Sequence, residues 1–291
     1  MIHENRKWTV VTGSTGGIGS EVVNILARMK KDLILVNRSS AEGPRQRDNL
    51  LRNFPGLSVE AVTANLMDTR SVFNAIDVIN ALPGPIDALY NVAGVLNAKK
   101  IFSEQGIESN FAVNTLAPYQ FVQGLRTKMA RSSEDSAAVI MNFSSSAISK
   151  QKSLDIDNLV DPPEVTGLMG TYAQAKLALT VLTAALAGDL KTDNILIRAV
   201  DPGATKTTMT TQNSSMPKLL QWFAPLFFAD ADKQATKVVR SADPSAFEGM
   251  TGIFVSNLKQ KKLPGPAADQ SNWRKLLVLL DHSLSVGERE N

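Results

Sequence analysis

Short apolar runs alternate with segments of helical periodicity along most of the chain. The apolar runs are rich in β-branched residues and end in glycine, asparagine or serine, a pattern typical of buried strands that stop at a turn. The predicted strands cover residues 9–12, 33–36, 57–62, 86–90, 137–143 and 195–200, with a seventh at 253–255. The predicted helices, in which apolar residues recur at three- and four-residue steps, cover residues 18–29, 68–81, 109–130 and 171–190.

Strands that alternate with helices predict βαβ units, and therefore a parallel sheet with helices on both faces. We expect a doubly wound, mostly parallel α/β fold with seven strands in a single domain over residues 1–291. Two longer irregular stretches, at about residues 146–170 and 204–230, follow predicted strands. They should emerge at the carboxyl edge of the sheet, where open α/β folds bind ligands, so we interpret them as substrate loops.

The composition excludes several classes of site. The chain has no cysteine, which rules out disulfides, thiolate zinc sites and cysteine nucleophiles. Its two histidines, His3 and His282, lie near opposite ends, so no metal site is expected. The net charge of +3 is scattered, and the densest basic run, residues 259–262, is interpreted as a solvated loop rather than a nucleic-acid patch. Without an apolar leader or a membrane-length apolar segment, we expect a cytoplasmic protein.

A glycine-rich turn follows the first predicted strand and opens the first predicted helix. Its sequence is Thr12-Gly13-Ser14-Thr15-Gly16-Gly17-Ile18-Gly19. Glycine permits a tight turn and a close approach of the backbone to a ligand, and the free N–H groups at a helix start attract phosphate. A plain strand-to-helix turn is the alternative. The expected dinucleotide contacts in this segment are Gly13, Ser14, Thr15, Gly17, Ile18 and Gly19.

Five further motifs follow in order, each at a predicted strand end or on a predicted helix. They are Asn91-Val92-Ala93-Gly94, Phe111-Ala112-Val113-Asn114, Asn142-Phe143-Ser144-Ser145, Tyr172-Ala173-Gln174-Ala175-Lys176 and Pro202-Gly203-Ala204-Thr205-Lys206-Thr207. With the glycine-rich turn, they resemble the short-chain dehydrogenase/reductase family over residues 8–255, most of all its retinol-dehydrogenase-like and protochlorophyllide-reductase-like branch. Val92 departs from the family's asparagine. The resemblance implies a Rossmann-type fold and hydride transfer with a nicotinamide coenzyme.

Tyr172 and Lys176 are expected to carry the proton chemistry. They are four residues apart on a predicted helix, so their side chains share one face. An ammonium near the phenol favours the phenolate, which suits Tyr172 to act as general acid in reduction and general base in oxidation. By the resemblance, Ser145 binds the substrate oxygen and Asn114 holds a water that links Lys176 to solvent. An asparagine that bonds the helix backbone is the alternative for Asn114.

The end of the second predicted strand favours NADP(H) over NAD(H). It continues into Asn37-Arg38-Ser39, with no carboxylate for a ribose 2′-hydroxyl, whereas the Arg38 guanidinium suits a 2′-phosphate. An exposed loop arginine is the alternative. The resemblance implies further coenzyme contacts at Asn65 and Leu66 near the adenine, Asn91, Ala93 and Gly94 near the adenosine ribose, Tyr172 and Lys176 near the nicotinamide, and Pro202, Gly203, Thr205 and Thr207 near the carboxamide or phosphate.

The expected substrate is a small, largely apolar carbonyl or alcohol. The candidate pocket residues are Leu96, Ala147, Met169, Met209, Trp222 and Phe223. Apolar residues at helical spacing within residues 219–226 predict a lid over the nicotinamide end, with packing on the core or a shallow membrane contact as alternatives. Reduction of an activated C=C bond, or a catalytically silent NADP-binding regulator, are alternative functions for the same fold. The sequence fits a homodimer or a monomer and leaves substrate identity and direction open.

Overall fold

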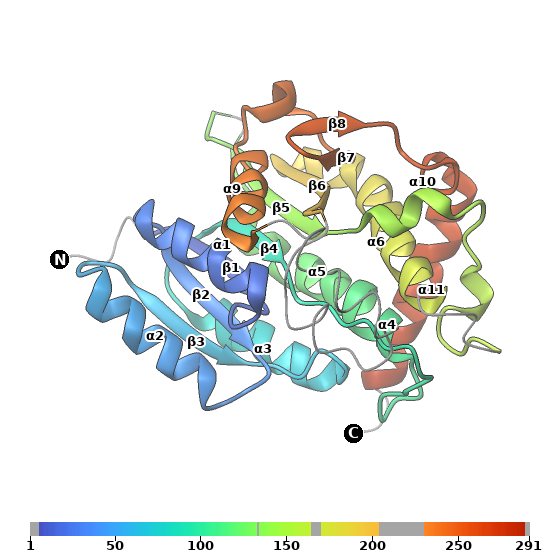
Figure 1. The fold of residues 1–291 in the computed structure, drawn as a ribbon, viewed down its shortest axis with the longest axis horizontal. Helices are drawn as coiled ribbons and strands as arrows, with labels where there is room; N and C mark the ends of the chain where they lie inside the picture. Colours follow the sequence, from blue (N-terminus) through green and yellow to red (C-terminus); the bar gives the residue numbers. More distant parts are fainter. Residues whose placement is uncertain (1–5, 133, 164–169, 204–229, 289–291) are drawn as a thin grey trace.

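Eight strands form one sheet at the centre of the protein. The computed structural model describes residues 6–132, 134–163, 170–203 and 230–288. The strands are β1 (Trp8–Thr12), β2 (Asp32–Asn37), β3 (Val59–Thr63), β4 (Ile86–Asn91), β5 (Ala138–Phe143), β6 (Ile195–Asp201), β7 (Ile253–Ser256) and β8 (Lys259–Lys261). Their order is β3-β2-β1-β4-β5-β6-β7-β8, and the strands from β3 to β7 are parallel (Figure 1). This is the doubly wound topology predicted, with the switch point between β1 and β4.

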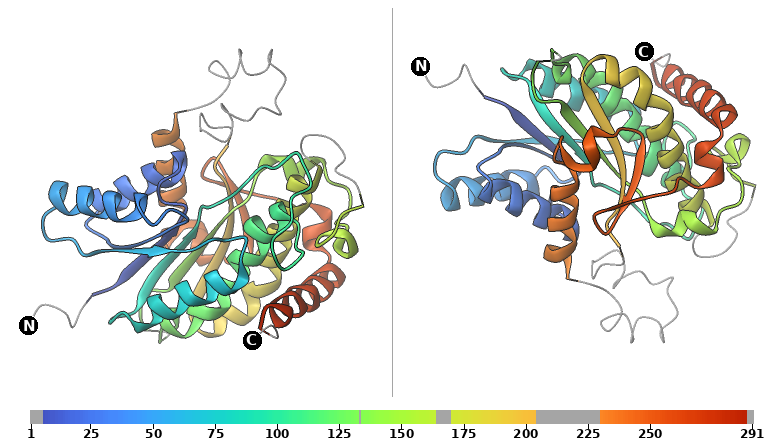
Figure 2. Two further views of the ribbon diagram at one scale, coloured as in Figure 1. Left: turned by 90° about the horizontal axis from the view of Figure 1, so that it is seen from below. Right: turned by 90° about the horizontal axis from the view of Figure 1, so that it is seen from above.

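Helices cover both faces of the sheet (Figure 2). One face carries α1 (Gly17–Arg28), α2 (Glu42–Asn53) and α9 (Ala231–Ser241), and the other carries α3 (Thr69–Ala81), α5 (Ala117–Met129), α6 (Gly170–Thr192) and α11 (Gln270–Glu288). Leu33 and Leu35 of β2 join the core on the first face, whereas Ile34 joins the core on the second. Because successive side chains of a strand point to opposite faces, a sheet covered on both sides needs the nearly continuous apolar runs seen in the sequence.

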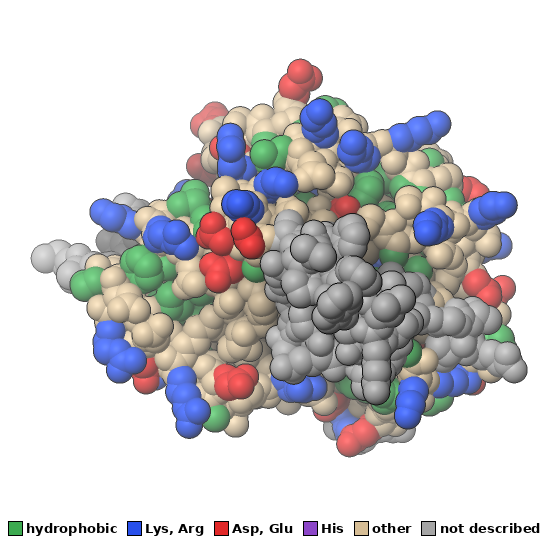
Figure 3. Space-filling view, viewed as in Figure 1, with side chains coloured by type: hydrophobic (Ala, Val, Ile, Leu, Met, Phe, Trp, Pro, Cys, Tyr) green, Lys and Arg blue, Asp and Glu red, His purple; other side chains and the backbone are tan. Residues whose placement is uncertain are grey.

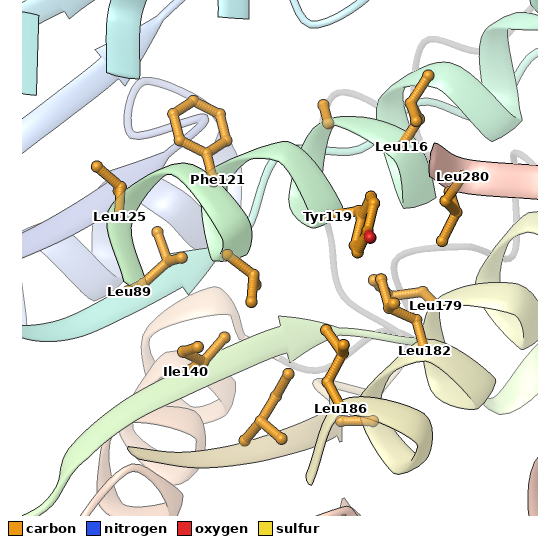
Figure 4. Close-up of a cluster of buried hydrophobic side chains, with 14 of the residues drawn as sticks. Leu89, Leu116, Tyr119, Phe121, Leu125, Ile140, Leu179, Leu182, Leu186 and Leu280 are labelled. Carbon is orange, nitrogen blue, oxygen red and sulfur yellow. The ribbon is translucent and has the colours of Figure 1, made fainter. Parts of the chain in front are cut away.

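The core under α5 and α6 fixes the helix that carries the predicted acid–base pair. Leu89 and Ile140 of the sheet belong to one buried cluster with Phe121 of α5 and Leu182 of α6 (Figure 4). Leu280 of α11 joins the same cluster from outside α6. The short α10 (Gly265–Ala268) precedes α11 and contributes buried Ala267 to this core. The helix α6 is therefore held between the sheet and the C-terminal helices.

The sheet edge beyond β7 differs from two predictions, the loop at residues 259–262 and the number of strands. Residues Lys259–Lys261 form a strand antiparallel to β7, not part of a loop, so the sheet has eight strands instead of seven. All three residues are exposed, so no apolar alternation marks this strand in the sequence, and backbone pairing with β7 alone defines it. Lysines on an edge strand discourage pairing with another chain.

A π-helical turn interrupts the helix predicted over residues 109–130. The segment begins as α4 (Ser109–Phe111), continues as the π-helical turn Ala112–Leu116 and ends as α5. Asn114 lies in the middle of that turn and is fully buried. Single π-helical turns inside α-helices are frequent at functional sites, because the extra residue re-aims the side chains around it.

The surface charge and the hydropathy of the described helices agree with what the sequence suggests. On the face shown in Figure 3, described basic side chains are spread around the margin with acidic ones among them. None of the described helices is long and apolar enough to cross a membrane. Within the described ranges, no group of three acidic or histidine side chains could hold a metal ion.

Candidate active site

Four of the predicted motifs lie at the carboxyl ends of four neighbouring strands. The glycine-rich turn follows β1, the Asn91–Gly94 motif begins at the end of β4, the serines follow β5, and Pro202 and Gly203 follow β6. These strands lie side by side as β1-β4-β5-β6. Motifs that are far apart in the sequence therefore meet along one edge of the sheet, where doubly wound folds bind ligands.

The glycine-rich turn brings its backbone very close to the segment after β4. Gly13 has a φ of 68°, and a Cβ there would lie 2.8 Å from the Ala93 Cα. A Cβ on Gly19 would lie 2.1 Å from the Gly13 carbonyl oxygen, so neither position admits a side chain without a shift. Gly16 caps α1 without a side-chain hydrogen bond. The start of α1 thus keeps donors that a phosphate group can bind.

The end of β2 is tied to the glycine-rich turn by side-chain contacts, one of which comes from Gln46, a residue that the sequence analysis did not single out. The Ser14 hydroxyl is fully buried, 2.8 Å from Asn37 Oδ1 and 2.6 Å from Gln46 Oε1. Gln46 Nε2 also donates to the Ser14 carbonyl oxygen at 2.8 Å. The Gln46 side chain of α2 therefore holds the glycine-rich turn in place, and the Ser14 side chain takes part in the same contacts. The Asn37 Nδ2 group is buried without a hydrogen-bond partner among the described residues.

The segment after β4 is bonded to both neighbouring strands. The Asn91 side chain donates from Nδ2 to Asn142 Oδ1 of β5 at 2.8 Å, and Ala93 N donates to Thr12 Oγ1 of β1 at 3.2 Å. Asn142 in turn donates to Thr183 Oγ1 of α6 at 3.0 Å. The Asn91 amide nitrogen therefore joins β4 to β5, whereas its Oδ1 is buried without a hydrogen-bond partner among the described residues.

Asn114 fixes the next residues of the same segment beside Lys176. Its Oδ1 accepts from Val95 N at 3.1 Å, and its Nδ2 donates to the Val95 carbonyl oxygen at 2.9 Å. A Cβ on Gly94 would lie 2.8 Å from Asn114 Oδ1 and 3.4 Å from Lys176 Nζ. Gly94 thus lies between these two polar side chains. The water relay predicted for Asn114 stays a prediction, whereas its side chain visibly holds Val95.

Replacing Gly94 by Ala should weaken NADPH binding and lower the unfolding free energy. The new methyl group would press on Oδ1 of the Asn114 carboxamide, which two hydrogen bonds hold in place, and overpacking of this kind costs about 1–3 kcal/mol. NADPH titration by fluorescence and thermal melting measure both effects. Gly188→Ala is the control, because nothing lies within 4 Å of a Cβ at that exposed site of α6. Equal behaviour of the two variants would contradict this account of Gly94.

Lys176 is buried beneath the site and bonded to the end of β5. Its exposed fraction is 4%, and Nζ donates to the Phe143 carbonyl oxygen at 2.7 Å. Nζ also lies 6.0 Å from the centre of the Tyr172 ring. Burial lowers the pKa of Lys176 to about 7 from its ordinary 10.5, because desolvation disfavours the ammonium. A proton on this amine is therefore readily gained or lost near neutral pH.

Tyr172 lies above Lys176 on the same helix and close enough to Ser145 for that hydroxyl to affect its pKa. Burial raises the pKa of the Tyr172 phenol, the hydrogen bond with Ser145 lowers it, and the negative charge of Asp201 raises it. The first of these causes is the largest, so the phenol holds its proton at neutral pH in the coenzyme-free protein. That state is the one needed to donate a proton to a carbonyl oxygen.

The adjacent serines have different partners. Ser144 is buried, and its hydroxyl lies 2.8 Å from Thr180 Oγ1, so it joins β5 to α6. Ser145 is partly buried, lies close enough to Tyr172 to lower the pKa of the phenol, and accepts from Ala147 N at 3.2 Å. Ser146 begins a short 3-10 helix and is exposed. This arrangement favours Ser145 as the hydroxyl that would meet a substrate oxygen.

The residues predicted to hold the adenosine end lie at the surface. Arg38 is exposed, and its side chain forms no ion pair or hydrogen bond within the described ranges, so its guanidinium is open to a ligand. Asn65 is also exposed, but its Oδ1 accepts from Met67 N at 3.3 Å and so shapes its own turn. Leu66 packs against the core.

Several predicted pocket residues lie outside the described residues. Leu96 and Ala147 are described, and both are partly buried at the segments after β4 and β5. The predicted residues without a description are Thr205, Thr207, Met169, Met209, Trp222 and Phe223, together with the lid predicted over residues 219–226. Their proposed contacts stay predictions.

Comparison with known proteins identifies the family. A chloroplastic short-chain dehydrogenase, TIC 32 A of Brassica napus, is 30% identical over 206 residues, which are 69% of this chain and only 64% of that protein. Polyprenol dehydrogenase of Danio rerio is 27% identical over 279 residues, 94% of this chain and 85% of that one. The fold is similar to that of a blue fluorescent protein from a metagenomic library in complex with NADPH, with a TM-score of 0.67, 23% identity, and coverage of 91% and 99%.

The family model of short chain dehydrogenases matches residues 7–156 and 163–218. These ranges include every strand from β1 to β6 and all of the motifs found in the sequence. The match confirms the family resemblance and the prediction of an oxidoreductase. The chain therefore belongs to the short-chain dehydrogenase family.

Proposed function

We propose that the protein is an NADP(H)-dependent oxidoreductase that interconverts a carbonyl group and an alcohol on a largely apolar molecule. The observation that carries this proposal is the convergence of Ser145, Tyr172 and Lys176 beside the glycine-rich turn. Ser145 lies close enough to Tyr172 to lower the pKa of the phenol, and Lys176 lies beneath the Tyr172 ring. The three side chains offer a proton, a hydrogen bond and a buried amine at one point.

The described residues fit a dinucleotide. Gly13 and Gly94 let the glycine-rich turn and the segment after β4 pack more closely than a Cβ would allow, and α1 begins with uncapped donors. Asn37 Nδ2 is a buried donor that still needs an acceptor. The turn, the start of α1 and the segment after β4 would hold the phosphates and adenosine, and Lys176 the nicotinamide ribose. When bound, the coenzyme supplies or accepts the hydride.

The protein's own side chains handle the oxygen of the substrate. In reduction, Tyr172 donates its proton to the carbonyl oxygen as negative charge develops there, and Ser145 donates a hydrogen bond to the same oxygen. Lys176 stabilises the phenolate that remains, because its amine can take up a proton near neutral pH. In oxidation, the same groups act in reverse, and Tyr172 accepts the alcohol proton.

Apolar carbonyl compounds are the substrates to test. The Danio rerio relative is a polyprenol dehydrogenase, which supports an apolar alcohol or aldehyde for this chain. We expect NADPH-dependent reduction of decanal and farnesal to exceed that of butanal, measured by coenzyme absorbance and by mass spectrometry of the alcohol. Coenzyme binding without any alcohol product from this series would contradict the proposed activity and would favour a regulatory role.

The choice of coenzyme depends on Arg38. The structural neighbour in complex with NADPH supports NADP(H), and the open Arg38 guanidinium at the end of β2 suits a 2′-phosphate. Arg38→Asp should weaken NADPH binding by roughly 2–3 kcal/mol and leave NADH binding little changed. Isothermal titration of both coenzymes measures this. Arg52→Asp, with the same charge change at an exposed site in the last turn of α2, should spare both affinities. Equal wild-type affinity for NADH and NADPH would overturn the assignment.

Assembly, domain organisation and compartment are part of the same proposal. We infer one domain with two substrate loops, since the sheet runs through the described chain without a break. Leu276 and Leu280 of α11 are buried in the core beside α6, so α11 occupies a face of α6 that a partner helix could use. This packing favours a monomer over a homodimer, and light scattering tests it.

We also propose a cytoplasmic location. Cell fractionation tests this location against the chloroplast, where the Brassica napus relative is found.

A further inference from the structure

A cluster of buried polar side chains lies beside the catalytic helix and takes no part in the chemistry described above. It comprises Asn97, Glu108, Ser109, Asn110 and Thr171, and is called the Asn110 cluster. The exposed fractions of Glu108, Ser109 and Asn110 are 1%, 0% and 0%. The cluster joins the segment after β4, the start of α4 and the first turn of α6. Buried polar groups that are fully paired specify one arrangement, because any other leaves them unpaired.

Glu108 orients the Asn110 carboxamide. Its Oε2 accepts from Phe111 N at 3.0 Å and so caps α4, while Oε1 accepts from Asn110 Nδ2 at 2.9 Å. Ser109 Oγ donates to the same Oε1 at 3.1 Å. Because a carboxylate only accepts hydrogen bonds, the Asn110 nitrogen must face it, and the orientation of the amide is fixed.

Asn110 uses that orientation to hold two other segments. It accepts from Asn97 N at 3.0 Å and donates to the Asn97 carbonyl oxygen at 2.9 Å. Asn114 forms the same pair of bonds with Val95. Two asparagines of one helical segment thus hold alternate residues of the chain after β4, on either side of Leu96. The backbone of residues 95–97 is therefore held in place by side chains of the helical segment that contains Asn110 and Asn114.

The third contact of Asn110 is to the residue before Tyr172. Asn110 Nδ2 lies 3.0 Å from Thr171 Oγ1, across 61 residues of sequence. Because the amide has two hydrogens and three acceptors within reach, it shares one hydrogen between two of them. Thr171 belongs to the first turn of α6, where N–H groups have no partner inside the helix and the backbone depends on outside contacts. Tyr172 must keep its hydroxyl at Ser145 and its ring over Lys176. A misplacement of about 1 Å in a catalytic group can cost about a hundredfold in rate.

We propose that Asn110, oriented by Glu108, is a positioning residue that sets the place of Tyr172 through Thr171. The inference rests on the proposed function, since it assigns a role within the same site. It accounts for a buried carboxylate and a buried amide that neither the coenzyme nor the substrate needs to touch.

Thr171→Val tests this directly, because it keeps the shape of the side chain and removes the hydroxyl oxygen. With NADPH and decanal, we expect kcat to fall roughly tenfold, with the KM for NADPH unchanged, since Tyr172 moves and the coenzyme site does not. Thr171→Ser keeps the oxygen and should restore kcat. Thr192→Val is the matched control, because among the described residues the Thr192 hydroxyl bonds only the Asp189 carbonyl oxygen, within the same helix.

Two further measurements separate positioning from general stability. In an Asn110→Ala background, Thr171→Val should lower kcat no further, because the pathway through Thr171 is already broken. Hydrogen exchange of the coenzyme-free protein should speed up in the first turns of α6 in Thr171→Val and not in Thr192→Val. Wild-type kcat and wild-type exchange in Thr171→Val, or independent effects of the two substitutions, would overturn the proposal. Wild-type protein that forms no alcohol from any aldehyde would instead refute the proposed function, and the exchange measurement would still decide the positioning role.

Discussion

Replacing Tyr172 by Phe is expected to lower kcat for carbonyl reduction by at least about a hundredfold, within the range of general acid–base contributions. The ring stays over Lys176, and only the hydroxyl beside Ser145 is removed. Without it, no described side chain in this position carries a proton of suitable pKa to the substrate oxygen. The Kd of NADPH should stay close to the wild-type value, because the turn after β1 and the segment after β4 are untouched.

Tyr119→Phe is the matched control for that variant. It also removes one phenolic hydroxyl, which bonds Asp281 Oδ1 of α11 at 2.5 Å on the outer side of α5. We expect a small loss of thermal stability and an unchanged kcat. Stopped-flow absorbance at the coenzyme band, with single turnovers of decanal, compares the two variants. If Tyr172→Phe kept most of the wild-type rate, Tyr172 would not be the proton donor and the mechanism would need another acid.

The strand-end residues of the site could be predicted because of how parallel sheets are built. Each motif follows an apolar run, and the carboxyl ends of neighbouring parallel strands lie at one edge. Ser145 and the Asn91–Gly94 motif therefore meet although they are distant in sequence. The spacing of Tyr172 and Lys176 also predicted a shared helix face, since that relation is local.

The supporting contacts could not be predicted in the same way. Gln46 reaches Ser14 across 32 residues, and Asn110 reaches Thr171 across 61. Such contacts depend on how whole helices sit against the sheet, and apolar periodicity does not record that placement. Glutamine and asparagine are also ordinary surface residues, so nothing in the sequence distinguishes the ones that become buried.

The sequence analysis did not predict α2 and β8, at the margins of the fold, for a related reason. Along α2, only Gly43 and Leu50 are buried, because the helix covers the sheet near its β3 edge with one narrow stripe. The strand β8 has no buried residue at all. Where an element buries little, its apolar pattern is weak, and backbone pairing or a few contacts decide its structure.

Lys176→Met should impair both coenzyme binding and turnover. The substitution removes the amine that bonds the Phe143 carbonyl oxygen and that lies beneath the Tyr172 ring. The phenolate left after proton donation would lose its cation, and the donor that we propose for the nicotinamide ribose would be lost. We expect kcat to fall at least about a hundredfold and the Kd of NADPH to rise about tenfold, measured by stopped-flow absorbance and fluorescence titration.

The same variant should change how stability depends on pH. The folded protein holds the pKa of Lys176 at about 7, whereas the unfolded chain has the ordinary 10.5. Between these values the unfolded state binds a proton that the folded state does not, so the unfolding free energy rises with pH by about 1.4 kcal/mol per pH unit. Burial of the ammonium lowers the unfolding free energy by its full amount below pH 7. This loss disappears as the pH rises toward 10.5. Methionine has no proton to lose, so Lys176→Met lacks this slope.

Urea denaturation of the coenzyme-free proteins between about pH 7 and pH 9 measures the difference in slope. Lys191→Met, at an exposed site in the last turn of α6, is the control and should follow the wild type at every pH. If wild type and Lys176→Met ran parallel, the amine would keep its charge in the folded state, which requires water or an anion beside it. In that case Lys176 would be a permanent cation under Tyr172 instead of a group that gains its proton as the phenolate forms.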